Sequence, residues 1–533
     1  MSKDVIELRA TSANTGTLIS KSDDTLRFAH DDNTLRRLGK RPLLDRSFGF
    51  MSSLGLSCSV LVSWEGILFT SVPTFLNVGP GGVVWAFLVG WVGITSVYIV
   101  IAELASMAPT AGGQYHWVAM MAPESCANFL TYLTAWLTTL AWQAIAITTS
   151  FSIATLIQGI VVLSIPSYDP RSWHTVLIMF AVALFSVLIN STTGRILAKF
   201  EGLFLVLHLL GFFGVLIPLV YFAPHNDPSE VFTVFSNNGN WPTQALAFFV
   251  GLPTIAGTLT GADCAVHMSE EVRSANTVVP QSLIYTITIN GSLAFAMIIA
   301  LLFCLSDAPA AAAAADTLYY PFLQIFESAV KSTTGACLMA GVILVIVIMS
   351  SISAYASASR MIWSFARDKG LPFDRILVKL NSNALPIYAI LSTMGFTTLL
   401  SLIVLGSSAV LSTLLSLLVT TLHSSYLLAC GLLLWHRFTG GIKPYIEASD
   451  VIHTDNLFWG PWKVPEPFGI INNVFACLYM MLLLFWSFWP QVNSPTPGEV
   501  NWSVLVYGTV ILFSVIWYVL KARRHFKGPV RET

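Results

Sequence analysis

Two apolar stretches of the chain contain residue types that could bind a ligand inside a membrane. The first stretch, 50–73, contains Ser63-Trp64-Glu65-Gly66, which places a carboxylate and a glycine near its middle. The second stretch, 243–263, contains Gly251, Pro253, Gly257, Thr258, Thr260, Gly261 and Asp263. Because proline removes a backbone donor and glycine lowers helix propensity, both stretches predict interrupted helices. Backbone groups freed at membrane depth need a ligand, an ion, water or a neighbouring helix as a partner.

The carboxylates add a second requirement, because an ionised group within a membrane is costly unless it is paired. Glu65 is the most deeply placed acid, and its partner is expected to be either a substrate cation or a hydrogen-bond donor on a neighbouring helix. Asp263 follows the second interruption and either orients the broken segment or serves the substrate pathway. The predicted substrate site therefore comprises residues of both interruptions, namely Ser63, Trp64, Glu65, Gly66, Gly257, Thr258, Thr260, Gly261 and Asp263.

Three further residues are candidates for coupling and gating. His208 lies about half-way along the apolar stretch 200–222, where an imidazole that changes charge near neutral pH suits a proton relay. A neutral His208 that is hydrogen-bonded inside the bundle explains the same position. Glu270 and Glu271 are expected at the cytosolic mouth, in a solvated or gate-latching role.

The composition indicates which elements must position these residues. The 533 residues include only 27 Lys+Arg and 28 Asp+Glu, 55% are apolar, and the mean hydropathy is +0.71. Soluble domains carry roughly one charged residue in four, so this chain has too few charges to coat soluble surfaces. A net charge of −1 argues against a nucleic-acid partner. We therefore expect an all-α integral membrane protein whose solvent is the lipid bilayer.

Apolar runs long enough to cross a bilayer, which takes roughly 20 residues per helix, occur twelve times in the sequence. They lie near 50–73, 82–107, 127–163, 173–190, 200–222, 243–263, 281–305, 335–366, 386–405, 408–435, 470–490 and 502–521. Each predicted break falls in the first helix of a five-helix unit, and such matched interruptions are typical of transporters built from inverted repeats. The expected units are residues 48–222 and 243–436, followed by two more helices within 470–521.

The distribution of Lys and Arg predicts how the chain is oriented in the membrane. If the N-terminus is cytosolic, 25 of the 27 Lys and Arg residues lie on the cytosolic side, as the positive-inside rule requires. Residues 1–47 are then expected to form a cytosolic, disordered tail, and 522–533 a second cytosolic tail. The Asn-Trp-Ser sequon at Asn501 falls outside and is a glycosylation candidate.

Three motifs, in the expected order, carry a family resemblance. They run from Glu103 to Ser106 with Pro109 to Trp117, from Thr260 to Glu271, and from Ser357 to Asp368. They resemble the fungal amino-acid/choline (γ-aminobutyrate/choline-type) permeases of the amino acid–polyamine–organocation (APC) superfamily over residues 45–525. The resemblance implies a leucine-transporter-type 5+5 inverted repeat plus two helices, with substrate bound between the interrupted first and sixth helices. Because the first break has one glycine and an acid, it is more similar to the choline and γ-aminobutyrate carriers than to carriers with a glycine-rich break.

The resulting functional prediction is a secondary active transporter, proton-coupled and located in the plasma membrane. It moves a small amine-bearing solute such as an amino acid, γ-aminobutyrate or choline by alternating access. Alternatives with the same fold are an exporter of an amine metabolite and a non-transporting nutrient sensor. An enzyme is not expected, because the ten histidines are scattered and the sequence has no HExxH or GxSxG motif. The seven cysteines show no CxxC spacing, so neither a metal nor a cofactor is expected.

Overall fold

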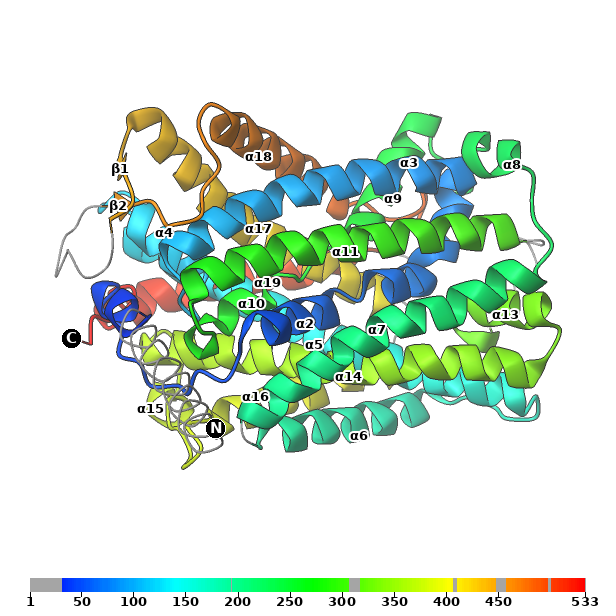
Figure 1. The fold of residues 1–533 in the computed structure, drawn as a ribbon, viewed down its shortest axis with the longest axis horizontal. Coiled ribbons are helices and arrows are strands. Elements are labelled where there is room, and N and C mark those ends of the chain that lie inside the picture. The colour runs from blue at the N-terminus through cyan, green and yellow to red at the C-terminus, as the bar shows by residue number, and fades with distance from the viewer. Residues whose placement is uncertain are drawn as a thin grey trace, which may run out of the picture.

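The computed structural model describes residues 31–192, 194–305, 317–405, 410–446, 457–496 and 500–532, which form a bundle of helices along one long axis (Figure 1). Residues 31–48 and 522–532 lie together at one end of this bundle, which we call the terminal end. Helices α8 and α13 lie at the opposite end, which we call the distal end (Figure 1).

The first unit, which has five membrane crossings, begins with an interrupted helix, as predicted. Helices α2 and α3 are separated by Val62, and α3 continues through a kink at Gly79 into the second crossing. Gly79 has φ 78°, and a Cβ there would lie 2.4 Å from the backbone nitrogen of Ser236, so only glycine fits this reversal. The helices of this unit are α2 (Phe50–Leu61), α3 (Ser63–Met107), α4 (Gln114–Met121), α5 (Ala127–Ser164), α6 (Ser172–Asn190) and α7 (Gly194–Phe222).

The second unit begins with the other interrupted helix. After α8 (Pro228–Thr233) come α9 (Gln244–Gly257), α10 (Cys264–His267), η1 (Ser269–Glu271), α11 (Ala275–Cys304), α13 (Phe322–Val330), α14 (Thr333–Arg367), α15 (Asp374–Leu377), α16 (Ile387–Ser401), η2 (Leu402–Leu405) and α17 (Val410–Thr439). The long helices α5 and α14 pack against each other in the centre of the bundle. They correspond to the two longest apolar runs of the sequence.

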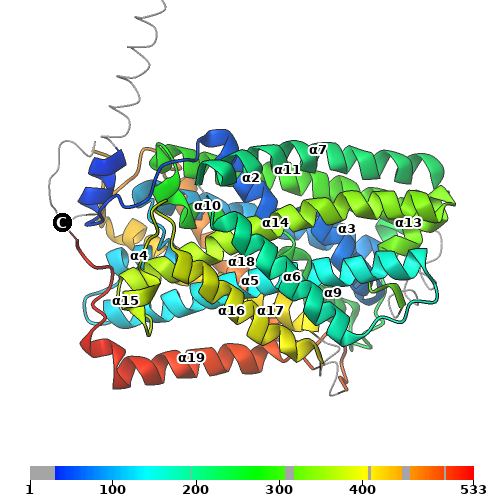
Figure 2. The ribbon, with the colours of Figure 1, turned by 90° about the horizontal axis from the view of Figure 1, so that it is seen from below.

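Two further membrane helices complete the bundle. They follow a two-stranded parallel sheet in which Ile442 pairs with Leu457. These elements are β1 (Ile442–Lys443), β2 (Leu457–Phe458), α18 (Phe468–Ser487), α19 (Ser503–Leu520) and η4 (Ala522–Arg524). Helix α19 lies at the edge of the bundle (Figure 2), and only Ser503 and Ser514 are buried on it. This exposure of apolar side chains fits a helix that faces lipid.

The count of membrane crossings confirms the predicted fold class. Eleven helices of the described chain are long and apolar enough to cross a membrane, and the fourteen-residue α9 is the shorter apolar helix of the interrupted sixth crossing. The chain is thus an all-α multi-pass membrane protein with the twelve predicted crossings. In lipid, helices satisfy every backbone group internally, which is why apolar runs of this length fold as helices.

The expected disordered tail is ordered from residue 31 onward. Residues 31–37 form a helix, and Leu35, Lys40 and Leu44 are buried. Phe48 forms a parallel bridge with Val272 directly after η1. Hydrogen bonds with Arg273, Ser274 and Glu532 hold this stretch. The tail boundary at residue 47 stays a prediction, and residues 1–30 lie outside the described chain.

Candidate functional site

The first membrane crossing is interrupted at Val62. Helix α2 ends at Leu61, Val62 adopts φ 32° and ψ 49°, and α3 begins at Ser63. A β-branched residue in this left-handed region is a true outlier. The predicted motif Ser63–Gly66 therefore forms the first turn of α3, and the break lies one residue before it. The Ser63 amide donates to Oδ1 of Asn290 at 3.3 Å, which satisfies one group freed by the break.

The sixth crossing is interrupted between Gly257, where α9 ends, and Cys264, where α10 begins. Gly261 has φ 126°, a conformation that favours glycine. Its amide and that of Ala262 both donate to the hydroxyl of Tyr98, at 2.8 and 3.0 Å. Pro253 lies inside α9, so the break follows the glycines rather than the proline.

Residues 258–260 of this second break use their backbone donors within the break and leave their backbone acceptors without a partner. The amides of Thr258, Leu259 and Thr260 donate to carbonyls three residues earlier, at 3.1 to 3.2 Å. No hydrogen bond from the described chain reaches the carbonyl oxygens of these same three residues. Two of these residues, Thr258 and Thr260, also line the cavity described next.

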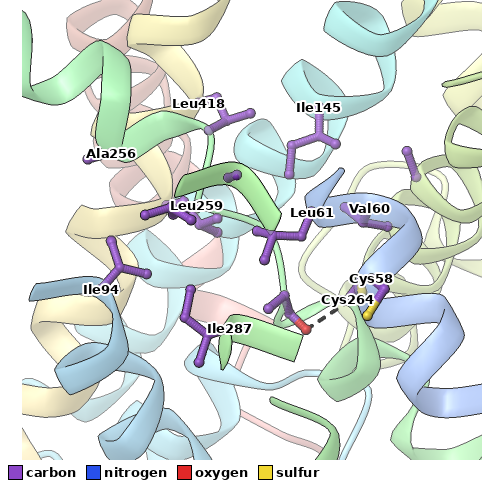
Figure 3. Close-up of a cluster of buried hydrophobic side chains, with 14 of the residues drawn as sticks. Cys58, Val60, Leu61, Ile94, Ile145, Ala256, Leu259, Cys264, Ile287 and Leu418 are labelled. Carbon is purple, nitrogen blue, oxygen red and sulfur yellow. Dashed lines mark hydrogen bonds between the residues drawn. The ribbon is translucent and has the colours of Figure 1, made fainter. Parts of the chain in front are cut away.

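The two breaks meet at a common cavity of about 100 Å³. A Cβ added to Gly66 would lie 3.5 Å from Cβ of Thr258, so these two residues face each other directly. The side chains of Val60 and Leu61 from α2 surround the breaks together with Leu259 (Figure 3). The remaining lining comes mainly from α5 and α17. None of the described lining residues is charged, and Thr70, Thr148, Thr149, Ser152, Thr258 and Thr260 supply its hydroxyls.

A second cavity of about 120 Å³ lies beside the first, toward the distal end. Phe69, Thr70, Gly257 and Leu415 line both cavities. The distal cavity also contains the predicted glycosylation candidate Asn501, whose Nδ2 donates to the Ser487 carbonyl at 2.9 Å. Glycosylation of Asn501 stays a prediction, and a glycan on Nδ2 would have to displace this contact.

Comparison with known proteins identifies the family of the chain. Residues 48–511 match the sequence profile of the amino acid permease family. The chain belongs to the amino acid permease family. The permease is 28% identical over 489 residues to the choline transporter of Saccharomyces cerevisiae, which covers 91% of this chain and 83% of the relative.

Two other relatives of the permease are also fungal. An uncharacterised amino-acid permease of Schizosaccharomyces pombe is 25% identical over 94% of this chain and 88% of its own length. A putative amino acid/polyamine transporter of Macrophomina phaseolina is 24% identical over 84% of this chain and 96% of its own. The family confirms the predicted resemblance and identifies a membrane transporter rather than an enzyme.

The predicted substrate residues fall into two groups according to whether they line the cavity shared by the two breaks, which we call the central cavity. Gly66, Gly257, Thr258 and Thr260 line the central cavity. The others, Ser63, Trp64, Glu65, Gly261 and Asp263, are outside its lining and contact neighbouring helices instead. Trp64, for example, packs against Phe212 of α7 with ring centroids 5.9 Å apart. A direct substrate contact by this second group stays a prediction.

Glu65 and His208 form a buried pair between α3 and α7. Oε1 of Glu65 lies 2.8 Å from Nδ1 of His208, and both side chains are fully buried. The other polar atoms, Oε2 of Glu65 and Nε2 of His208, are buried without a hydrogen-bond partner. The pair thus brings together two residues that the sequence analysis singled out separately, and it provides two titratable groups that share one hydrogen bond.

Glu201 is a buried acid that the sequence reasoning missed. It lies on α7 seven residues before His208 and accepts a hydrogen bond from Oγ of Ser353 at 2.6 Å. The available signal was an acid inside the apolar run 200–222. Because seven residues are about two helical turns, Glu201 and His208 lie on the same face of α7.

Asp263 is held on the terminal side of the second break. Its Oδ2 accepts a hydrogen bond from Nε2 of Gln114 at 2.7 Å and lies 3.5 Å from Nε2 of His267. Asp263 therefore links the broken sixth crossing to α4, which favours the orienting role over direct substrate contact.

Glu270 and Glu271 form ion pairs with two arginines of α14 at the terminal end of the bundle. Glu271 accepts from Nε of Arg360, and Glu270 accepts from Nη1 of Arg367, each at 2.8 Å. All four side chains are buried, so the acids are not solvated at a mouth as one expected role required. Arg360 and Arg367 lie within the third sequence motif, but sequence alone gave no sign of their pairing.

Proposed function

We propose that the protein is a proton-coupled secondary transporter that moves a small amine-bearing solute across the plasma membrane by alternating access, with both termini in the cytosol. The main support for this proposal is that two interrupted helices meet at Gly66 and Thr258. The second break also leaves backbone acceptors without a partner beside the cavity. Amino acids, γ-aminobutyrate and choline are the proposed solutes. The relatives described as a choline transporter and as a putative amino acid/polyamine transporter support an amine.

The free acceptors favour recognition of a cationic group. Helix α2 ends at Leu61 and α9 ends at Gly257, so the C-terminal ends of both helices meet at the cavity. These ends carry partial negative charge from the helix dipole, while the first turn of α3 at the same cavity carries partial positive charge. The carbonyls of Thr258 and Thr260 therefore decide the preference, and an ammonium group can donate hydrogen bonds to them.

The buried pair of Glu65 and His208 is the proposed proton site. A membrane-buried acid and imidazole joined at 2.8 Å can hold or release a proton without contacting the solute directly. Trp64 directly precedes Glu65 and belongs to the first turn of α3, as Gly66 does. A change in protonation would thus act on the helix that lines the cavity.

The two ends of the bundle fit one state of an alternating-access cycle. The distal cavity lies beside the central one, while Glu270 and Glu271 pair with arginines of α14 at the terminal end. We propose that these two ion pairs are the inner gate, which must separate before solute reaches the cytosol.

The test is an uptake panel with the purified permease in proteoliposomes. Radiolabelled choline, γ-aminobutyrate, a polyamine and several amino acids are compared under an inward proton gradient. At least one amine is expected to accumulate, and an uncoupler is expected to stop the accumulation. Uptake that depends on sodium and ignores the proton gradient would contradict the coupling, and binding without any transport of these solutes would favour a sensor.

A further inference from the structure

A basic pocket lies at the terminal end, away from the substrate path. It is formed by the segment between α14 and α15 and by the end of α19, and it encloses about 490 Å³. The pocket is lined by the cationic or titratable side chains of Lys369, Arg375, Lys521 and His525 and by the aromatic rings of Phe373 and Trp517. We call this set the basic pocket. The transport mechanism proposed above does not use it.

The cations of this pocket are not neutralised by the surrounding protein. Within the described ranges, no ion pair reaches Lys369, Arg375 or Lys521. Asp374 is the one acid among the lining residues, and its carboxylate accepts the backbone amide of Arg375 at 2.8 Å. The Lys521 ammonium lies 5.0 Å from the centre of the Trp517 ring. In a chain with a net charge of −1, this is a local concentration of positive charge that fits an anionic ligand.

The wall that carries Lys369 is fixed by hydrogen bonds of the backbone. The Lys369 amide donates to the Ala366 carbonyl at 2.9 Å, and the Gly370 amide donates to the Phe365 carbonyl at 3.0 Å. The Tyr132 hydroxyl donates to the Gly370 carbonyl at 3.3 Å. The pocket is therefore largely preformed, which lowers the entropic cost of binding.

The position of the pocket relative to the bilayer indicates the source of the anion. Lys521 directly follows α19, a helix long and apolar enough to cross a membrane, so it is placed at the end of a membrane crossing. Phe373 on the opposite wall is 77% exposed. Cations beside exposed aromatic rings at a helix end are typical of the headgroup level of a membrane.

We propose that the basic pocket binds the phosphate-bearing headgroup of an anionic membrane lipid, with the acyl chains along the exposed face of α19. Lysine and arginine recognise phosphate by charge and hydrogen bonds. A free phosphate compound would meet the same cations, but it would leave Phe373 and the apolar face of α19 without a partner.

The pocket adjoins the C-terminal segment, residues 522–532, at the terminal end of the bundle. Lys369 follows Asp368, which accepts the Val530 amide at 2.9 Å, and Ala522 to Arg524 begin that C-terminal segment. A bound headgroup would contact both sides of this junction. It is therefore expected to hold the C-terminal segment against α14.

The test measures binding of a fluorescent, short-chain phosphatidylinositol bisphosphate to the full-length permease in neutral detergent. The double variant Lys369→Gln/Lys521→Gln is expected to bind about 25-fold more weakly, since each lysine near such a headgroup contributes roughly fivefold. The matched control is Lys379→Gln/Lys443→Gln, which removes two exposed lysines of the same end outside the pocket. Arg375→Gln alone provides a second pocket variant.

Binding that is equal in the pocket and control variants would overturn the proposal. The competing compounds identify the source of the anion: inorganic phosphate and the soluble inositol phosphate headgroup are expected to displace the probe only at much higher concentration than the lipid. Displacement by the soluble headgroup at the same concentration as the lipid would overturn the membrane source. Because all the substituted lysines are exposed, size-exclusion elution and the melting temperature are expected to be unchanged in every variant.

Discussion

Nδ1 of His208 lies 2.8 Å from Oε1 of Glu65, and neither side chain has any exposed surface. Glu65, predicted to pair with either a substrate cation or a hydrogen-bond donor on a neighbouring helix, is thus paired with an imidazole of α7. The same carboxylate directly precedes Gly66, which does line the central cavity. The proposed proton site and the proposed solute site are therefore adjacent in the sequence of α3.

The first prediction concerns proton coupling. Glu65→Gln keeps the volume of the side chain but removes its charge, so uptake driven by an inward proton gradient is expected to fall by about tenfold. Exchange of labelled for unlabelled solute, which needs no net proton movement, is expected to persist. Both rates are measured in proteoliposomes.

The control for this variant is Glu124→Gln, which changes an exposed glutamate and is expected to leave both rates unaltered. His208→Gln is expected to reproduce the Glu65→Gln phenotype, because it removes the other half of the pair. If Glu65→Gln retained the full response to the proton gradient, the pair would be structural only.

The second prediction concerns the shape of the cavity. Gly66→Ala places a methyl group 3.5 Å from Cβ of Thr258, an ordinary contact distance, so the protein should fold. The methyl group occupies space between the two breaks, and the KM for uptake is expected to rise about tenfold. The measurement is saturation uptake at matched expression.

Gly341→Ala serves as the matched control, because a Cβ at Gly341 on α14 meets nothing within 4 Å. Its KM is expected to equal that of the unmodified permease. An unchanged KM in Gly66→Ala would place the solute elsewhere.

The third prediction concerns the support of the second break. Tyr98→Phe removes the oxygen that accepts the amides of Gly261 and Ala262. Buried donors left without a partner cost about 1–3 kcal/mol, so the melting temperature is expected to fall. Tyr221→Phe, at a residue that is 78% exposed, is expected to leave it unchanged. Equal melting temperatures for the two variants would show that other groups satisfy these amides.

The fourth prediction concerns pH and the C-terminal segment. Burial disfavours the charged form of Glu532, but hydrogen bonds from Arg367 and from the Arg41 amide outweigh this effect and hold the pKa of the carboxyl below its usual 4.5. A lowered pKa means that the contact stabilises the attached segment above pH 4.5 and loses this effect as the pH falls through the lower value.

Hydrogen exchange of residues 526–532 is the measurement for this prediction. Protection is expected to be constant from pH 7 down to about 4.5, after correction for intrinsic exchange, and to decrease at more acidic pH. Glu532→Gln is expected to show the low protection at every pH. Protection that falls already between pH 7 and 6 would contradict the assignment to Glu532.

The sequence predicted the crossings and the two interrupted helices because those features depend on local composition. Apolar runs determine the helices, and as expected α9 ends at Gly257 and Gly261 lies within the second break. The first break was predicted at Ser63–Gly66 but lies at Val62. Valine is not a helix-breaking residue, so the sequence gives no sign that its surroundings hold Val62 in the left-handed region.

The partners of the site could not be predicted in the same way. Glu65 and His208 are 143 positions apart, and Tyr98 lies 163 positions before the amide of Gly261. Such contacts depend on how the helices pack, which a single sequence does not reveal. The order of residues 31–47 has the same cause, because it comes from contacts with distant segments rather than from local propensity.

The central claim is that the solute sits between Gly66 and Thr258. The most direct measurement is modification of Thr258→Cys by a small cationic methanethiosulfonate reagent, with and without the transported solute. Cys126 and Cys337 are replaced by alanine, because the other five native cysteines are buried. The solute is expected to slow modification, with half-protection at its transport KM. A modification rate that does not change at concentrations that saturate transport would contradict it.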